Sequence, residues 1–169
     1  MAIPINNYRE HYIDHQFPNI CCNYEVLGNN VNTLLAYNCV AFAADDITKH
    51  YWPSAPGLGN YWPPNIKRVE DIQSFIALFA SLNYIPCNLN ELYEDGFEKV
   101  AIYVDETHKP THVAKQCIGD NGCWRSKLAH RHVIKHTLGG LCGLFNRGSD
   151  YGNVALILKR PARIIRAMI

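Results

Sequence analysis

The chain has 169 residues, of which 48% are hydrophobic and 18% are charged, and its formal net charge at pH 7 is +1. This length and composition predict one compact globular domain and exclude a disordered chain. The small net charge gives no support for binding nucleic acid or acidic surfaces. The basic segment 159–166 is expected to be a solvated chain end.

The sequence carries no signal for a membrane or for export. No stretch approaches the ~20 apolar residues of a membrane span, and residues 1–14 lack the basic-then-apolar order of a signal peptide. The seven cysteines are odd in number and irregularly spaced, which favours reduced thiols over a disulfide framework. We therefore expect no membrane partner, and either a cytoplasmic location or delivery by a specialised secretion route.

The first half of the chain predicts two helices. Residues 1–36 show no clear pattern and are expected to be an irregular N-terminal segment. Residues 39–50 have apolar side chains at helical spacing after Asn38, a good N-cap residue, and residues 69–82 give the clearest helix pattern. Between these helices "YWP" occurs twice around a Gly- and Pro-rich loop, so the two Trp-Pro corners are expected either to cap a core or to line a cleft.

The second half of the chain predicts an antiparallel sheet. A "GDNG" turn signal at 119–122 separates two runs of strand character, as in a hairpin. The predicted elements are strands over 99–106, 111–118, 123–129 and 153–161, and a glycine-closed helix over 132–140. Helices first and an antiparallel sheet afterwards, with one more helix, predict an α+β domain.

Cys39 is the first residue of the predicted helix over 39–50. A helix N-terminus offers N–H groups and partial positive charge, which are expected to lower the pKa of the thiol and to serve as oxyanion donors. The nucleophile also needs a base, and His112 at the start of a predicted strand is the best candidate. Alternation puts His112 on one face with Ala114 and Gln116, and this face is expected to meet the helix. The alternative is a buried thiol and a surface histidine.

A third polar group is needed to orient His112, and its identity depends on one hairpin. A two- or four-residue loop puts Arg125 on the His112 face, whereas a three- or five-residue loop with a bulge puts Ser126 there. The sequence leaves this register open. Asp105 and His136 are further candidates, and a dyad without a third side chain is also possible.

"YNCVAFAADD" and the later "THVAKQCIGDNGCWRSKLA" resemble the core of papain-like cysteine peptidases and amidases, and are closest in style to the NlpC/P60 branch. In that branch a cysteine begins a helix, a histidine begins a later strand, and a polar residue lies on the next strand. The resemblance implies a single papain-like α+β domain over 1–169 with its catalytic core at 37–161. In this domain N-terminal helices, including the nucleophile helix, pack on an antiparallel sheet.

The resemblance also implies roles for individual residues. Cys39 corresponds to the nucleophile, His112 to the general base, and the third position falls near Ser126, where this sequence lacks the usual histidine or asparagine. The aspartate before the cysteine and the Ser-Gly after it, which mark NlpC/P60 proteins, are absent as well. The chain also resembles an uncharacterised bacterial family with "YNCxAxA", "HxAxQ", "GxWxSKL" and late "YG…KRP" motifs, which add no functional assignment.

These patterns together predict a cysteine-dependent hydrolase or acyl-transfer enzyme that acts on an amide bond. Peptidase, amidase and protein deamidase outcomes share this machinery, so the expected partner is a peptide, protein or amide substrate. A bacterial toxin or effector with a cognate inhibitor protein is one setting that analogy suggests. The alternative is a catalytically inactive papain-like binding module.

Other motifs give weaker signals. Trp52, Trp62, Trp124 and Lys127 are candidate substrate contacts. His132 and His136 are spaced like metal ligands on a helix, but neither an H-E-x-x-H motif nor a C-x2-C pair accompanies them. Complete phosphate-binding motifs are also missing, so the sequence predicts no metal and no cofactor.

Overall fold

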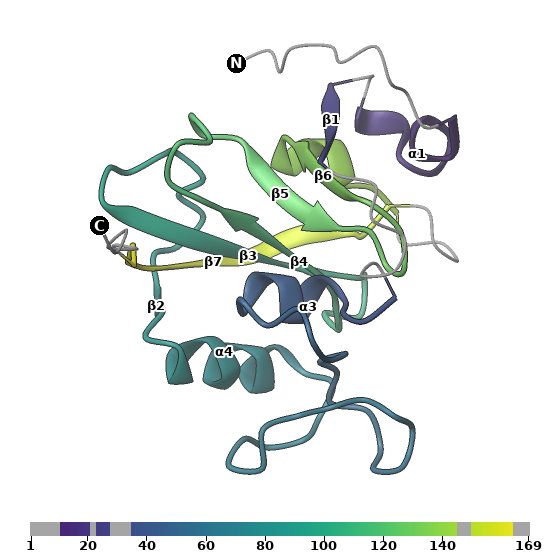
Figure 1. The fold of residues 1–169 in the computed structure, drawn as a ribbon, viewed down its shortest axis with the longest axis vertical. Coiled ribbons are helices and arrows are strands. Elements are labelled where there is room, and N and C mark those ends of the chain that lie inside the picture. The colour runs from purple at the N-terminus through teal and green to yellow at the C-terminus, as the bar shows by residue number, and fades with distance from the viewer. Residues whose placement is uncertain (1–10, 21–22, 28–34, 145–149, 164–169) are drawn as a thin grey trace, which may run out of the picture.

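The computed structural model describes residues 11–20, 23–27, 35–144 and 150–163 (Figure 1). In this part of the chain seven strands form one sheet in the order β1-β6-β5-β4-β3-β7-β2, and every neighbouring pair is antiparallel. The strands are β1 (Tyr24–Leu27), β2 (Ile85–Pro86), β3 (Phe97–Val104), β4 (Pro110–Gln116), β5 (Trp124–Lys127), β6 (Val133–His136) and β7 (Asn153–Pro161).

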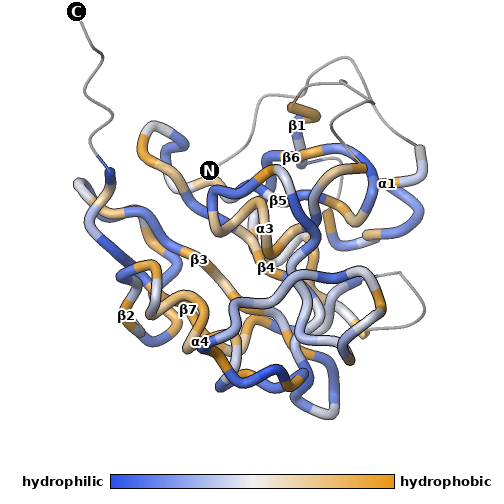
Figure 2. Tube along the Cα trace, turned by 60° about the horizontal axis from the view of Figure 1, so that its bottom comes forward, coloured by the Kyte–Doolittle hydropathy of each residue, from blue (hydrophilic) through white to orange (hydrophobic). Residues whose placement is uncertain are grey.

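Short helices cover both faces of the sheet. They are α1 (His11–Gln16), η1 (Pro18–Ile20), α3 (Cys39–Ala43), α4 (Ile72–Ser81) and η2 (Leu138–Leu141), of which η1 and η2 are 3-10 helices. Figure 1 shows α3 and α4 on one face, and α1 and η2 toward the other. Each face has its own hydrophobic cluster, and Figure 2 shows hydrophobic segments along β3 and β7 between them.

The papain-like α+β fold expected from the sequence is wrong. The described residues form mostly antiparallel sheet with few short helices, which is not a papain-like arrangement of helices and sheet. One reason is that the helix expected over 132–140 is strand β6 followed by the single 3-10 turn η2. Strand β6 pairs with β1 on one side and β5 on the other, and its β-branched Val133 and Ile134 suit that position.

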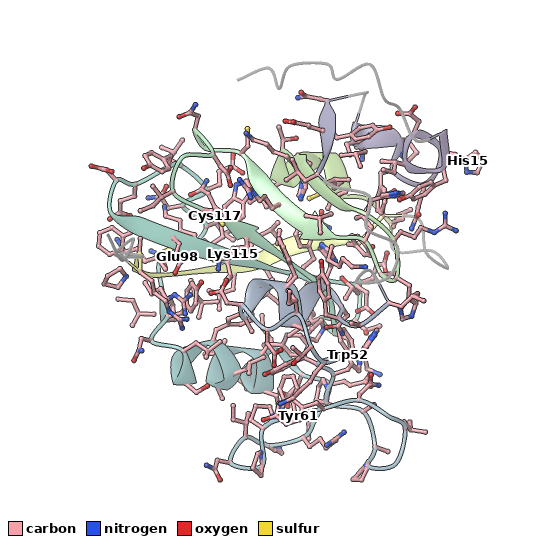
Figure 3. The ribbon with its side chains drawn as sticks, viewed as in Figure 1. His15, Trp52, Tyr61, Glu98, Lys115 and Cys117 are labelled. Atoms are coloured by element: carbon pink, nitrogen blue, oxygen red, sulfur yellow. The ribbon has the colours of Figure 1, made fainter. Side chains whose placement is uncertain are left out.

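The helix expected over 39–50 ends at Ala43. Asp45 has the left-handed φ of 63°, which stops the helix, and its carboxylate accepts hydrogen bonds from Lys115 and from Arg160 at 2.6 Å. Glu98 completes a partly buried ion cluster with the same two cations, and Figure 3 shows Glu98 beside Lys115. Although burial alone would raise it, the pKa of Asp45 is lowered by these cations. The cluster anchors the end of α3 to the sheet.

Other predicted elements are confirmed. The helix expected over 69–82 is α4, with Asp71 as N-cap accepting a hydrogen bond from the Ser74 N–H at 2.8 Å, and the last strand has the expected bounds. Strands β3, β4 and β5 lie within a few residues of their expected positions. These segments carry strong local signals, either a cap before an apolar stripe or an alternating run.

The N-terminal segment contains more structure than its sequence pattern predicts. The irregular segment expected over 1–36 includes α1, η1 and β1, and β1 pairs with β6 along its whole length. Phe17 and Ile20 are buried in the cluster beneath α1. Residues 1–10, 21–22 and 28–34 lie outside the described residues. None of the described helices has the length and apolar character needed to cross a bilayer.

The repeated Trp-Pro corners form one small unit. Tyr51 and Tyr61 form a parallel bridge, and the Trp52 N–H donates to the Tyr61 carbonyl at 3.0 Å. The rings of Trp52 and Trp62 both contact Phe75 of α4, with centroid distances of 5.4 and 5.5 Å. The unit therefore caps the core on the α3/α4 face.

Candidate functional site

Cys39 is the first residue of α3 and is fixed there by its neighbour Asn38. The Ala41 N–H donates to Asn38 Oδ1 at 3.1 Å, and the Asn38 amide donates to the Tyr51 carbonyl at 2.7 Å. Asn38 thus caps the helix and joins its start to the first Trp-Pro corner, seen at Trp52 in Figure 3. The Cys39 residue is 7% exposed.

Burial decides the protonation of the Cys39 thiol. It raises the pKa to about 11, although the N–H groups of Val113, Val40 and Cys39 and the ammonium of Lys127 act in the opposite direction. The expectation of a lowered thiol pKa is therefore wrong, because desolvation outweighs the local polar groups. At neutral pH the sulfur is a thiol surrounded by groups that stabilise negative charge.

His112 lies on β4 and is almost completely buried. Its ring stacks on Tyr151, with centroids 4.0 Å apart and planes 3° from parallel, and meets Tyr103 edge-on at 5.5 Å. Burial, with a smaller contribution from His136, holds the pKa of His112 well below its usual value. The imidazole is therefore neutral at neutral pH, and burial makes its protonated form less favourable.

Tyr151 is held in place by backbone contacts. Its carbonyl accepts a hydrogen bond from Thr111 Oγ1 at 2.6 Å. The next residue, Gly152, has a φ of 79°, and a Cβ there would lie 1.9 Å from the Val104 carbonyl oxygen. Only glycine fits this approach, so the Tyr-Gly pair determines where the Tyr151 ring meets His112.

Ser126 links His112 to a second buried histidine. Its Oγ lies 2.8 Å from His112 Nε2 and 2.8 Å from His136 Nε2, and His136 Nδ1 lies 2.7 Å from the Thr137 carbonyl oxygen. These contacts join β4, β5 and β6 through side chains.

The β4–β5 connection decides the register that the sequence left open. Lys115 and Arg125 are the register pair between the two strands, and the connection over 117–123 has an odd number of residues. This register puts Ser126 on the His112 face. Asp105, the other candidate, instead accepts hydrogen bonds from Thr107 and Lys109 within a turn.

Cys39 and His112 line one cavity of about 280 Å³. The remaining lining residues are Asn38, His50, Trp52, Asn60, Thr111, Ala129, His130 and Tyr151. Helix α3 packs on the face of β4 that carries Val113, not on the Ala114 face as expected. The two candidate catalytic residues therefore line one cavity, with Cys39 at the start of α3 and His112 near the start of β4, instead of facing each other across one face of the sheet.

A family model described as "Domain of unknown function (DUF7689)" matches residues 30–159. The chain belongs to this family. No curated protein and no solved structure matches the chain, and nothing in these comparisons links the DUF7689 domain to papain-like or NlpC/P60 peptidases.

The DUF7689 match includes Cys39, His112, Ser126, His136 and Tyr151. The whole cavity lining also lies within it, because that lining runs from Asn38 to Tyr151. The candidate site therefore lies within the matched family domain and not in a flanking segment.

Two of the predicted substrate contacts lie away from the cavity of the DUF7689 domain. Trp62 is buried in the cluster beneath α4, where its indole N–H donates to the Lys67 carbonyl at 3.1 Å. Trp124 is buried on the opposite face and lines a separate cavity of about 500 Å³. By contrast, Trp52 lines the cavity that contains Cys39.

Lys127 lies close to Cys39 without lining the cavity. It is fully buried, its ammonium donates to the Ala129 carbonyl at 2.7 Å, and burial lowers its pKa to about 8. The thiolate form of Cys39 would raise that pKa, so the two groups interact electrostatically. Lys127 can therefore stabilise negative charge on the sulfur.

Sequence reasoning missed most of the cavity lining of the DUF7689 domain. His50, Asn60 and His130 come from three loops with no shared motif, and only the Tyr-Gly pair at Tyr151 left a local signal. Within the described residues, no group of three or more His, Cys, Asp or Glu side chains could hold a metal ion.

Proposed function

We propose that this chain is a cysteine-dependent hydrolase or acyl-transfer enzyme that acts on an amide bond, with Cys39 as nucleophile and His112 as general base. One observation carries the proposal. The thiol and the imidazole line the same cavity, and His112 Nε2 forms a hydrogen bond with Ser126 Oγ. A nucleophile, a base and an orienting group are the three parts that this chemistry requires.

Because the thiol and the imidazole are both neutral at neutral pH, the proposed attack requires that Cys39 lose its proton during the reaction and not before it. His112 Nε2 contacts Ser126, so Nδ1 is the nitrogen that takes the proton as Cys39 Sγ bonds to the carbonyl carbon. The N–H groups and the ammonium near the sulfur lower the cost of the charge that develops there. The imidazolium then protonates the leaving amine, and water or another acceptor releases the acyl group.

The lining of the cavity favours a neutral reacting group. None of its ten residues is Asp, Glu, Lys or Arg. A peptide bond or a side-chain carboxamide carries no charge that would need a partner there. Peptides, proteins and small amides are therefore the substrates that we propose.

We expect p-nitrophenyl acetate, a small neutral acyl donor, to acetylate Cys39 in preference to the other cysteines. The measurement is intact mass followed by peptide mapping of the wild type, Cys39→Ala and Cys142→Ala. Cys142 is a matched control because its thiol is free and partly buried but lines a different cavity. The Cys39→Ala variant should lose the rapid acetylation, and Cys142→Ala should keep it. Even labelling of all cysteines would contradict the proposal.

The raised thiol pKa favours a second candidate, a module that binds a small ligand in the same cavity without turnover. The labelling experiment separates the two. An unreactive Cys39 in a folded protein supports the binding module, whereas a stable or turning-over acetyl group on Cys39 supports the enzyme.

A further inference from the structure

We infer that His136 is a positioning residue of this site: through Ser126 it determines which nitrogen of His112 carries the proton. This inference deepens the proposed function and rests on it. His136 is not one of the residues that line the cavity, and the hydrogen-bonded link between it and His112 is the Ser126 hydroxyl between the two rings.

The direction of the hydrogen bonds follows from the far end of the chain of contacts. His136 Nδ1 lies 2.7 Å from the Thr137 carbonyl oxygen, which can only accept, so Nδ1 carries a hydrogen. The ring is fully buried, and burial lowers its pKa to about 4, so it is neutral at neutral pH. Nε2 of His136 therefore has a lone pair and must accept from Ser126.

The single hydroxyl hydrogen of Ser126 is therefore donated to His136 Nε2 and is not available to His112. Its oxygen, 2.8 Å from His112 Nε2, can only accept from that nitrogen, so Nε2 carries the hydrogen of the neutral ring. Nδ1 of His112 is left with a lone pair, and the described residues offer it no hydrogen-bond partner. The relay thus prepares the base form that the proposed reaction needs.

The opposite hydrogen-bond direction, with Ser126 donating to His112, has a large cost in free energy. If Ser126 donated to His112, His136 Nε2 would have to donate as well, which makes His136 an imidazolium. That charge would be buried beside the hydrophobic cluster that contains Trp124 and Ile134, and no carboxylate forms a hydrogen bond or salt bridge with it among the described residues. The observed geometry therefore selects one arrangement.

Removing the acceptor should reverse the arrangement. In His136→Leu the Ser126 hydroxyl loses its acceptor, and His112 Nε2 is the remaining one within 2.8 Å. The hydroxyl then donates to Nε2 and shifts His112 toward the Nδ1–H tautomer, which cannot take the thiol proton. His136→Gln can place an amide oxygen where Nε2 stood, and should restore the original direction.

The test is the tautomer of each ring, read from histidine side-chain ¹⁵N–¹H correlations at neutral pH. In the wild type we expect Nε2–H for His112 and Nδ1–H for His136, in His136→Leu a shift of His112 toward Nδ1–H, and in His136→Gln a return. Acetylation of Cys39 should fall about tenfold or more in His136→Leu and recover in His136→Gln.

Wild-type spectra with Nδ1–H on His112, or with a doubly protonated His136, would overturn the inference even if neither variant folds. An unchanged His112 tautomer in folded His136→Leu would overturn it too. These readouts need no activity. An unreactive Cys39 with the expected tautomers would therefore remove the proposed function, whereas a reactive Cys39 with the wrong tautomers would remove only the role of His136.

Discussion

Replacing His112 by alanine is expected to lower the rate of Cys39 acetylation at neutral pH by a factor of about 10²–10⁴, the usual contribution of a general base. The reason is the raised thiol pKa of about 11, which leaves very little thiolate at neutral pH. Without a base the reaction depends on that small fraction. The rate is measured as release of p-nitrophenolate by the wild type and by the variant.

A matched control is His15→Ala, because His15 is an exposed residue of α1 that points away from the molecule in Figure 3. It should react at the wild-type rate. The far-ultraviolet circular dichroism of His112→Ala shows whether the variant is folded. A folded His112→Ala that acetylates Cys39 as fast as the wild type would show that His112 is not the base.

The free energy of unfolding is expected to decrease in mild acid, at pH values well above those at which most carboxylates titrate. The pKa values of His112 and His136 are lowered in the folded state, to about 4 for His136, whereas the unfolded chain titrates at about 6.5. Between these values the unfolded chain binds more protons, so stability falls as the pH decreases. Each histidine contributes a slope of about 1.4 kcal/mol per pH unit.

That slope is large beside a typical unfolding free energy of about 5–15 kcal/mol. Denaturant unfolding at several pH values from about 4 to about 8 measures it. Asp45 acts in a lower window, because its lowered pKa costs stability only as the pH falls below about 4. His136→Gln should remove about half of the slope between pH 5 and pH 6.5, because the proton uptake on unfolding falls by roughly one proton. A free energy that stays level over that range would contradict the buried neutral histidines.

The predictable parts of the fold are those with a local cause. Asn38 before Cys39 and Asp71 before α4 each accept a hydrogen bond from an N–H group three residues further on, and strand β7 is one unbroken run. The segment "HVIKH" has no such cause. It becomes a strand because β1 and β5 pair with it on both sides, and that pairing depends on distant sequence.

The same distinction applies to the site. Cys39 and His112 could be predicted because Cys39 begins α3 and His112 lies near the start of β4, and both do line one cavity. The contact of Ser126 with both histidines depends on the length of the β4–β5 connection, and the thiol pKa depends on burial by residues far along the chain. Helix polarity can be read from the sequence, but desolvation cannot, so the predicted direction of the pKa shift was wrong.

The most direct test of the central claim is the pH dependence of Cys39 acetylation in the wild type. If neutral His112 takes the proton from the neutral thiol, the rate should stay nearly level from about pH 7 to about pH 9, because both groups keep their protonation state there. In His112→Ala it should rise about tenfold per pH unit, as the thiolate fraction does below a pKa of about 11. A tenfold rise per pH unit in the wild type as well would show that Cys39 reacts as an ordinary buried thiol without a base.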